Sequence, residues 1–195
     1  MYTLIGTHKS RAFRVLWMLE ELELEYSHVP APPHDPVVNK YNPLGRIPVL
    51  LNGEDTLRDS TVIMNYLADR HGQIAPPAGS IARAETDALT HQILDEFDGL
   101  LWTAARHTFI LPEDHRVPEI KPELRWEFHR NCDRIAERLE DNPFLMGDDM
   151  TIPDIVLTHC LGWAITAKFG VENDVLRSYL NAMKSRPAYV VATGS

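Results

Sequence analysis

Residues 46–51 read Arg-Ile-Pro-Val-Leu-Leu, and this stretch decides how the N-terminal part of the chain folds. The apolar run over 47–51 predicts a buried strand that a turn at Gly53 ends. Proline cannot donate a hydrogen bond to a sheet, so Pro48 either begins this strand as an ordinary trans proline or follows a cis peptide bond. The cis form costs only about 0.5–1 kcal/mol at X–Pro, and it can leave the N–H and C=O of Ile47 free to pair with a ligand.

The residues on either side of this strand alternate between strand and helix patterns. Ser10 can cap a helix with apolar residues at helical spacing, and Asp59 or Ser60 can cap a second helix that ends at Gly72. Residues 1–74 therefore form an α/β domain with the predicted order βαβαββα. Its other strands are predicted over residues 2–5, 26–29 and 56–58.

The chain changes character after a linker over residues 73–80, which is rich in proline and glycine. Beyond the linker, apolar residues recur every three or four positions, and no strand pattern replaces them. Residues 81–195 are therefore predicted to be an all-α bundle domain. The clearest helical patterns lie over residues 89–104, 124–139, 152–169 and 174–184. The last of these helices is expected to stop before Arg186 and Pro187.

The composition excludes several classes of function. The chain has 195 residues, of which 44% are hydrophobic, and this is ordinary for a soluble globular protein. The net charge is -9 without a long basic run, which argues against nucleic acid or an anionic membrane as a partner. Cys132 and Cys160 are far apart, and with no signal-peptide pattern they predict a reducing, cytoplasmic location. The scattered histidines predict no metal site.

The turn over residues 6–11 follows the first strand and leads into the first helix. A helix start presents backbone N–H groups and the positive end of the helix dipole, which together favour an anion. Residues 8–14 hold two arginines, a lysine and a histidine but no acid, so the local charge also favours an anion. Thr7 and Ser10 each place a hydroxyl in this turn. The alternative roles are a cap for Ser10 and a local turn bond for Thr7.

Residues 59–61, Asp-Ser-Thr, stand at the start of another helix. The N–H groups of a helix start accept a carboxylate, and the carboxylate of Asp59 can accept an ammonium. A zwitterionic amino-acid head would satisfy both features, although plain capping is the alternative. The segment over 151–154, Thr-Ile-Pro-Asp, is different, because Asp154 can reach back to Thr151 in a capping box. We therefore expect a role in folding for Asp154, and no role in catalysis.

Several segments, taken together and in order, resemble the glutathione transferase superfamily over nearly the whole chain. In the N-terminal part these are residues 11–22 (Arg-Ala-Phe-Arg-Val-Leu-Trp-Met-Leu-Glu-Glu-Leu), 42–50 (Asn-Pro-Leu-Gly-Arg-Ile-Pro-Val-Leu) and 57–67 (Leu-Arg-Asp-Ser-Thr-Val-Ile-Met-Asn-Tyr-Leu). In the helical part they are residues 144–148 (Phe-Leu-Met-Gly-Asp), 151–154 and 186–188 (Arg-Pro-Ala). The resemblance implies an N-terminal thioredoxin-like domain that binds glutathione, followed by the helical bundle. It also implies a homodimer with residues 81–106 at the contact.

The resemblance further implies how glutathione binds. The backbone of Ile47, which precedes Pro48, would pair with the cysteinyl unit. Asp59 and Ser60 would hold the γ-glutamyl head. The glycyl carboxylate would lie near Arg46, and less directly near His34 or Lys40.

The hydroxyl after the first strand would donate a hydrogen bond to the sulfur of glutathione. Thr7 aligns best with that position and Ser10 follows, so the donor is Thr7, Ser10 or a backbone N–H. The sulfur would attack a small electrophile in a pocket for which Trp102, Arg106 and Trp163 are candidates, with core or surface packing as their alternative role. Two other functions stay open: a glutathione-dependent disulfide reductase, and a binding module without turnover.

Overall fold

The computed structural model describes residues 1–139 and 142–194, and these residues form two compact units. The first unit contains residues 1–78 together with 184–194, and the second contains residues 79–183. The C-terminal segment therefore packs with the N-terminal unit, whereas the sequence placed it in the helical domain. Within the described residues, no helix combines the length and the hydrophobicity needed to cross a bilayer.

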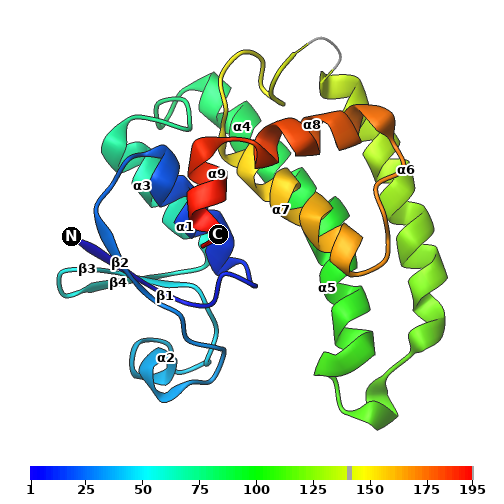
Figure 1. The fold of residues 1–195 in the computed structure, drawn as a ribbon, viewed down its shortest axis with the longest axis horizontal. Coiled ribbons are helices and arrows are strands. Elements are labelled where there is room, and N and C mark those ends of the chain that lie inside the picture. Colours follow the sequence, from blue (N-terminus) through cyan, green and yellow to red (C-terminus); the bar gives the residue numbers. More distant parts are fainter. Residues whose placement is uncertain (140–141, 195) are drawn as a thin grey trace. The chain divides into compact units, whose positions relative to one another are not determined.

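A four-stranded mixed sheet in the order β2-β1-β3-β4 lies in the middle of the first unit, with helices on both of its faces (Figure 1). The strands are β1 (Tyr2–Ile5), β2 (Tyr26–Val29), β3 (Val49–Asn52) and β4 (Asp55–Arg58). β1 runs parallel to β2 and antiparallel to β3, and β4 runs antiparallel to β3. β3 begins two residues later than the apolar run predicted, so Ile47 and Pro48 lie just outside the strand.

Four helices complete this unit: α1 (Ala12–Glu21), α2 (Pro36–Tyr41), α3 (Ser60–His71) and α9 (Pro187–Ala192). α3 has the predicted ends, because the Asp59 side chain caps its start and Gly72, at φ 69°, ends it. α1 begins at Ala12, one position later than a cap at Ser10 predicts. The Ser10 hydroxyl nevertheless accepts a hydrogen bond from the Ala12 N–H at 3.1 Å, so it satisfies one of the free donors at the helix start.

The predicted order includes a helix between β2 and β3, which is α2, but assigned it no residues; α9 was not predicted. Proline occupies the first position of both helices, where its fixed φ suits a helix and its missing N–H costs nothing. Asp35 caps α2 by accepting a hydrogen bond from the Val37 N–H at 2.9 Å. The helix predicted over residues 174–184 does stop before Arg186, as α8 (Asp174–Lys184). It is not the last helix, because Pro187 begins α9.

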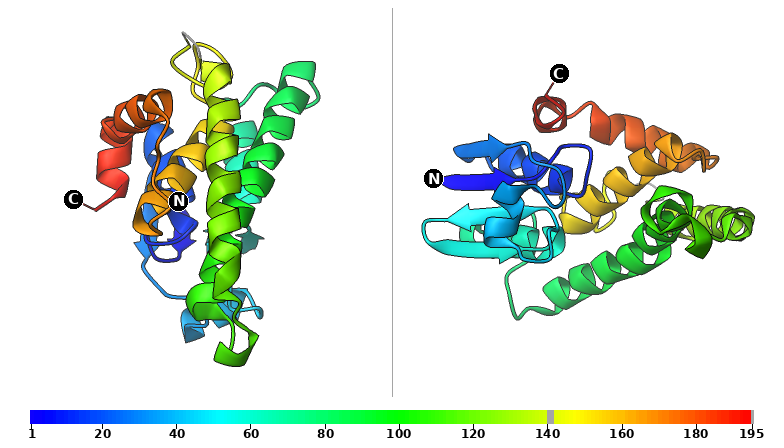
Figure 2. Two further views of the ribbon diagram at one scale, coloured as in Figure 1. Left: turned by 90° about the vertical axis from the view of Figure 1, so that its right-hand side faces the viewer. Right: turned by 90° about the horizontal axis from the view of Figure 1, so that it is seen from below.

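The second unit is all-helical, as predicted. It contains α4 (Ile81–Ile93), α5 (Gly99–Ala105), α6 (Lys121–Leu139), α7 (Ile152–Thr166) and α8 (Asp174–Lys184). π-Helical turns η1 (Leu94–Asp98) and η2 (Arg106–Ile110) flank α5, and the short 3-10 turns η3 (Glu113–His115) and η4 (Pro118–Ile120) lead into α6. α5 and α6 pack side by side (Figures 1 and 2). Beside them, η1 also contacts α6, and the ring of Phe97 on η1 meets that of Phe128 on α6 edge-on at 5.5 Å.

The capping box at the start of α7 is present. The carboxylate of Asp154 accepts hydrogen bonds from the N–H and the hydroxyl of Thr151, from the Leu145 N–H and from the Tyr179 hydroxyl, at 2.8–3.0 Å. Burial raises the pKa of the Asp154 carboxyl, and the four hydrogen bonds oppose that shift. Every one of these partners belongs to the second unit, so the carboxylate ties α7 to α8 and to the preceding loop.

We expect Asp154→Ala to lower the free energy of unfolding by about 3 kcal/mol, because it leaves several buried donors without an acceptor. Urea unfolding followed by circular dichroism measures the loss. Asp149→Ala, which removes an exposed acid from the same segment, is the matched control and should change stability by less than about 0.5 kcal/mol. Equal losses in both variants would contradict a folding role for Asp154.

Candidate functional site

The sheet register brings together the three segments that the sequence singled out. Ile5 at the end of β1 pairs with Val49 at the start of β3, and Val49 pairs with Arg58 at the end of β4. Because β1 and β4 both run antiparallel to β3, the chain leaves all three positions at the same end of the sheet. Gly6, Pro48 and Asp59, the next residues outward, therefore lie at one edge.

Gly6 lets the turn after β1 lie directly against Ile47. Its φ is 147°, and a Cβ placed on it would lie 2.8 Å from the Ala12 Cβ and 3.2 Å from the Ile47 Cβ. A side chain therefore cannot be accommodated here without a shift of the backbone. The Ile47–Pro48 peptide bond is cis, which is one of the two forms that the sequence left open.

His28 also holds Gly6, and the sequence patterns did not reveal this residue. Its Nε2 lies 2.7 Å from the carbonyl oxygen of Gly6, while the Gly6 N–H donates to the Val29 carbonyl at 3.0 Å. Its position next to the end of β2, a strand that pairs with β1, could have indicated that it lies beside the turn after β1. The N–H and the C=O of Gly6 are thus both hydrogen-bonded, which fixes the direction in which the chain leaves β1.

The two hydroxyls in residues 6–11, which we call the hydroxyl turn, have different hydrogen bonds. Ser10 Oγ donates to the Thr7 carbonyl at 2.7 Å and accepts from the Ala12 N–H at 3.1 Å, so its single proton is engaged within the turn. Thr7 Oγ1 accepts from the Lys9 N–H at 3.4 Å. That bond leaves the Thr7 proton available to a ligand, and the Thr7 side chain is half-buried at the edge of the sheet.

The surroundings of the hydroxyl turn favour negative charge. The turn leads into the N-terminus of α1, where the first backbone N–H groups and the helix dipole present partial positive charge. His8 and Lys9 are exposed beside it, and the next acid along the chain is Glu20. An anion at this position is therefore stabilised by the fold as well as by a hydroxyl.

Asp59 combines a capping role with an unusual backbone conformation. Its φ is 71° and its ψ is 128°, a region that residues with a side chain rarely adopt. Its Oδ1 accepts hydrogen bonds from the N–H of Thr61 at 2.9 Å and of Val62 at 3.2 Å. With both bonds on Oδ1, Oδ2 can accept from an ammonium group. Ser60 is buried beside it at the first position of α3.

The structure brings His34 and Arg46 together at the same end of the sheet. The His34 N–H donates to the Gly45 carbonyl at 2.8 Å, and the His34 ring packs so closely on Gly45 that a Cβ there would lie 2.1 Å from its Nδ1. Gly45 precedes Arg46, and both Arg46 and His34 are exposed. Lys40 belongs to α2 instead, with its Nζ 4.9 Å from the centre of the Tyr41 ring.

The three candidates for an electrophile pocket all belong to the second unit. Trp102 lies on α5, Arg106 begins η2, and Trp163 lies on α7, a helix that contacts α5. Arg106 donates a hydrogen bond to Thr103 Oγ1 at 3.1 Å. The contact between α5 and α7 makes these helices neighbours, but it does not define a binding pocket for the three residues.

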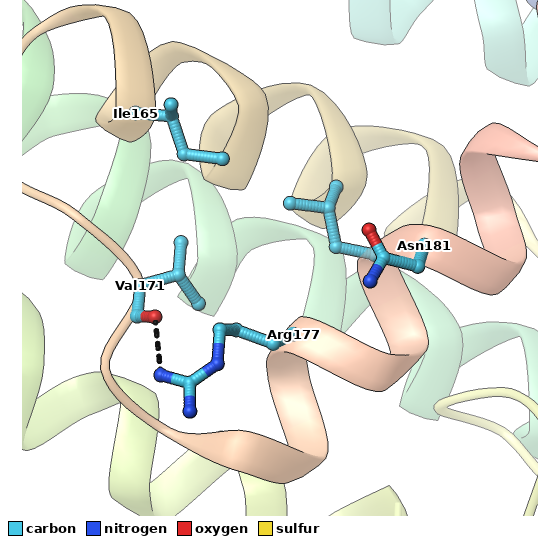
Figure 3. A pocket seen from close by; sticks show the side chains of 5 residues that line it. Ile165, Val171, Arg177 and Asn181 are labelled. Atoms are coloured by element: carbon cyan, nitrogen blue, oxygen red, sulfur yellow. Dashed lines mark hydrogen bonds between the residues drawn. The ribbon is translucent and has the colours of Figure 1, made fainter.

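The helical unit also has a surface pocket of about 230 Å³ that the sequence did not indicate (Figure 3). Ile165, Val171 and Leu180 form its apolar wall, and Arg177 and Asn181 its polar side. The Arg177 guanidinium donates to the Val171 carbonyl at 3.2 Å and to the Glu172 carbonyl at 2.7 Å. Its charge therefore fastens the loop that precedes α8.

Neither cysteine is arranged as a nucleophile. Cys132 and Cys160 are buried in the second unit, and burial raises the pKa of the Cys132 thiol to about 12, so this thiol stays protonated near neutral pH. Across residues 1–139 and 142–194, no group of three or more histidines, cysteines or acids is placed to hold a metal ion. The end of the sheet instead presents a hydroxyl beside a helix start that favours an anion, and a carboxylate oxygen of Asp59 that can accept from a cation.

Sequence comparison points to one protein family. Residues 4–77 match the family model of the glutathione S-transferase N-terminal domain, and residues 101–187 match that of the C-terminal domain. The chain is 29% identical over 152 residues to glutathione S-transferase GstA of Escherichia coli O157:H7, which covers 75% of this chain and 71% of that protein. It is 26% identical to a zeta-class glutathione S-transferase of Euphorbia esula, over 84% of this chain and 75% of that protein.

Solved structures show the same fold. A glutathione transferase family member from Pseudomonas fluorescens pf-5, solved with two glutathione bound, has a TM-score of 0.84 at 20% identity, over 98% of this chain and 91% of that one. The theta-class glutathione S-transferase of Xanthomonas axonopodis pv. citri, solved with glutathione bound, has a TM-score of 0.80 at 23% identity, over 100% and 97%. Since both domain models match in order over most of its length, the chain belongs to the glutathione S-transferase superfamily.

Proposed function

We propose that this protein is a glutathione transferase and that glutathione lies across the end of the sheet where β1, β3 and β4 meet. The γ-glutamyl ammonium binds Asp59 Oδ2, and its carboxylate binds the N–H groups at the start of α3. The cysteinyl backbone pairs with Ile47, and the glycyl carboxylate lies toward Arg46 and His34. The observation that carries the proposal is the pairing of Ile5, Val49 and Arg58, which puts all these groups at one edge.

Thr7 is the donor to the sulfur in this proposal, because its proton is available whereas that of Ser10 is bonded to the Thr7 carbonyl. A free thiol has a pKa of about 8.5, and lowering it by about two units takes about 2.7 kcal/mol. A hydrogen bond to a charged acceptor contributes about 1.5–3 kcal/mol, and a helix N-terminus adds about 0.3–1 kcal/mol. The hydroxyl turn therefore accounts for the required stabilisation without a general base.

The reaction then follows from the position of the thiolate. The thiol releases its proton to solvent, and the sulfur forms a bond to an electrophilic carbon of the second substrate. Where that carbon carries a leaving group, such as the halide of an aryl halide, the leaving group departs with its electron pair. No protein cysteine takes part, in agreement with the burial of Cys132 and Cys160.

Thr7→Val is predicted to reduce kcat/KM with an aryl halide by about 10- to 100-fold, because the sulfur loses one hydrogen bond to its charged form. Glutathione affinity should change by less than about threefold, since the tripeptide is held elsewhere. Thr7→Ser keeps the hydroxyl and is the matched control, which should retain activity. Steady-state kinetics and calorimetric titration measure the two effects. Full activity in Thr7→Val together with its loss in Ser10→Ala would identify Ser10 as the donor instead.

Asp59→Asn should weaken glutathione binding by about tenfold, because the ammonium loses a charged acceptor, while Asn still caps α3. A glutathione analogue that lacks the γ-glutamyl amino group tests this directly. The analogue is expected to bind the wild-type protein and the variant with equal affinity in calorimetric titrations. If the variant weakens both ligands equally, Asp59 does not contact the ammonium.

A further inference from the structure

The C-terminal helix α9 lies along α1 inside the first unit (Figure 1). The ring of Tyr189 packs edge-on against the ring of Phe13, with centroids 5.0 Å apart, and against the ring of Trp17, with centroids 4.9 Å apart. Phe13 lies in the first turn of α1, the helix that follows the hydroxyl turn. The last helix of the chain therefore contacts the helix that carries the proposed sulfur site.

A second contact fastens the other end of α1. Arg186 Nε and one of its terminal nitrogens bind the two carboxylate oxygens of Glu21 at 2.7 and 2.8 Å. Trp17 Nε1 donates to the same carboxylate at 2.8 Å. The Glu21 side chain is only 9% exposed and that of Arg186 is 32% exposed, so water screens this pair less than an ordinary surface pair. Bidentate geometry also fixes the orientation of both groups.

The three residues of α1 in these contacts form one stripe. Phe13, Trp17 and Glu21 are spaced by four, which places them on the same face from the first turn of α1 to its last residue. An isolated helix of ten residues is marginal in water, so its position depends on what packs against it. Tyr189 of α9 contacts Phe13 and Trp17, and Arg186 just before α9 binds Glu21, so together they span this stripe. We call α9 with Arg186 the α9 splint.

The start of α1 is connected to Thr7 by an unbroken set of hydrogen bonds. The Phe13 N–H donates to the Ser10 carbonyl at 3.0 Å, and the Ala12 N–H donates to Ser10 Oγ at 3.1 Å. Ser10 Oγ then donates to the Thr7 carbonyl at 2.7 Å. A displacement of the first turn of α1 therefore moves the backbone that carries the Thr7 hydroxyl.

We propose that Arg186 is a positioning residue for the thiol chemistry: through Glu21 and α1, the α9 splint holds the Thr7 hydroxyl where it can donate to the sulfur. This rests on the proposed function, in which that sulfur belongs to glutathione. Arg186 binds Glu21 at the last residue of α1, the end of the helix away from the hydroxyl turn. Its contribution is to fix the donor, because a preorganised hydrogen bond stabilises an anion more than one that must first be oriented.

The test is the pKa of the glutathione thiol on the protein, followed by the ultraviolet absorbance of the thiolate during a pH titration at saturating glutathione. With Arg186→Gln, the ratio of thiolate to thiol at a given pH should fall about threefold, which corresponds to a pKa higher by about half a unit. Tyr189→Leu should also raise the pKa of the bound thiol. Arg186→Lys keeps the positive charge but loses the bidentate guanidinium, so its thiol pKa should lie between those of wild type and Arg186→Gln. If Arg186→Gln does not fold, Arg186→Lys takes its place in the test.

Arg134→Gln is the matched control, because it removes an exposed positive charge from α6 in the other unit, and it should leave the thiol pKa unchanged. All titrations are made at a temperature where circular dichroism shows every variant folded, so lower stability alone does not change the readout. A lowered thiol pKa in wild type that Arg186→Gln leaves unchanged overturns the positioning role and retains the proposed function. A wild-type protein that does not lower the thiol pKa overturns both.

Discussion

The pairing of Ile5 with Val49 and of Val49 with Arg58 is the constraint on which the candidate site depends. These pairs determine that Gly6, Pro48 and Asp59 leave the sheet at one end, although they are far apart in sequence. A register shift of one residue would turn the buried faces of these short strands outward, so the hydrophobic core that selects the register also assembles the site. The close packing of Gly6 on Ile47 then leaves no room for another arrangement of the first turn.

The hydroxyls of Ser10 and Thr7 have different roles in this arrangement. The Ser10 hydroxyl donates to the carbonyl of Thr7 and accepts from the N–H of Ala12 at the start of α1. It therefore holds the turn together, while Thr7, the proposed donor to the sulfur, has a proton that is not used in these bonds. Small contributions suffice at such a place, because one charge-assisted hydrogen bond and one helix terminus together match the energy of a shift of about two pKa units.

Much of this fold was predictable from the sequence, since its strongest signals are local. The strand over 2–5 ends at a glycine, and α3 has a cap at Asp59 and a left-handed Gly72 at its end. The second unit follows a sustained helical period, and its capping box at Asp154 was readable by itself. The three predicted segments stand next to strand ends, and the sheet register brings those ends to one edge.

The misses have physical causes. α2 and α9 begin with proline, which usually interrupts a helix but suits its first position, so the patterns assigned no helix after Pro36 or Pro187. The contact of Arg186 with Glu21 joins residues at opposite ends of the chain, and no local pattern announces such a contact. Which hydroxyl has a free proton was likewise beyond the sequence, because it depends on hydrogen-bond partners that only the folded turn defines.

The most direct test of the account is the location of the sulfur in a crystal structure of this protein with glutathione. The account predicts that the sulfur lies within hydrogen-bond reach of Thr7 Oγ1, at the start of α1, with the γ-glutamyl head at Asp59. A sulfur bonded to Ser10 Oγ, or a tripeptide bound away from the end of the sheet where Ile5, Val49 and Arg58 pair, would contradict it.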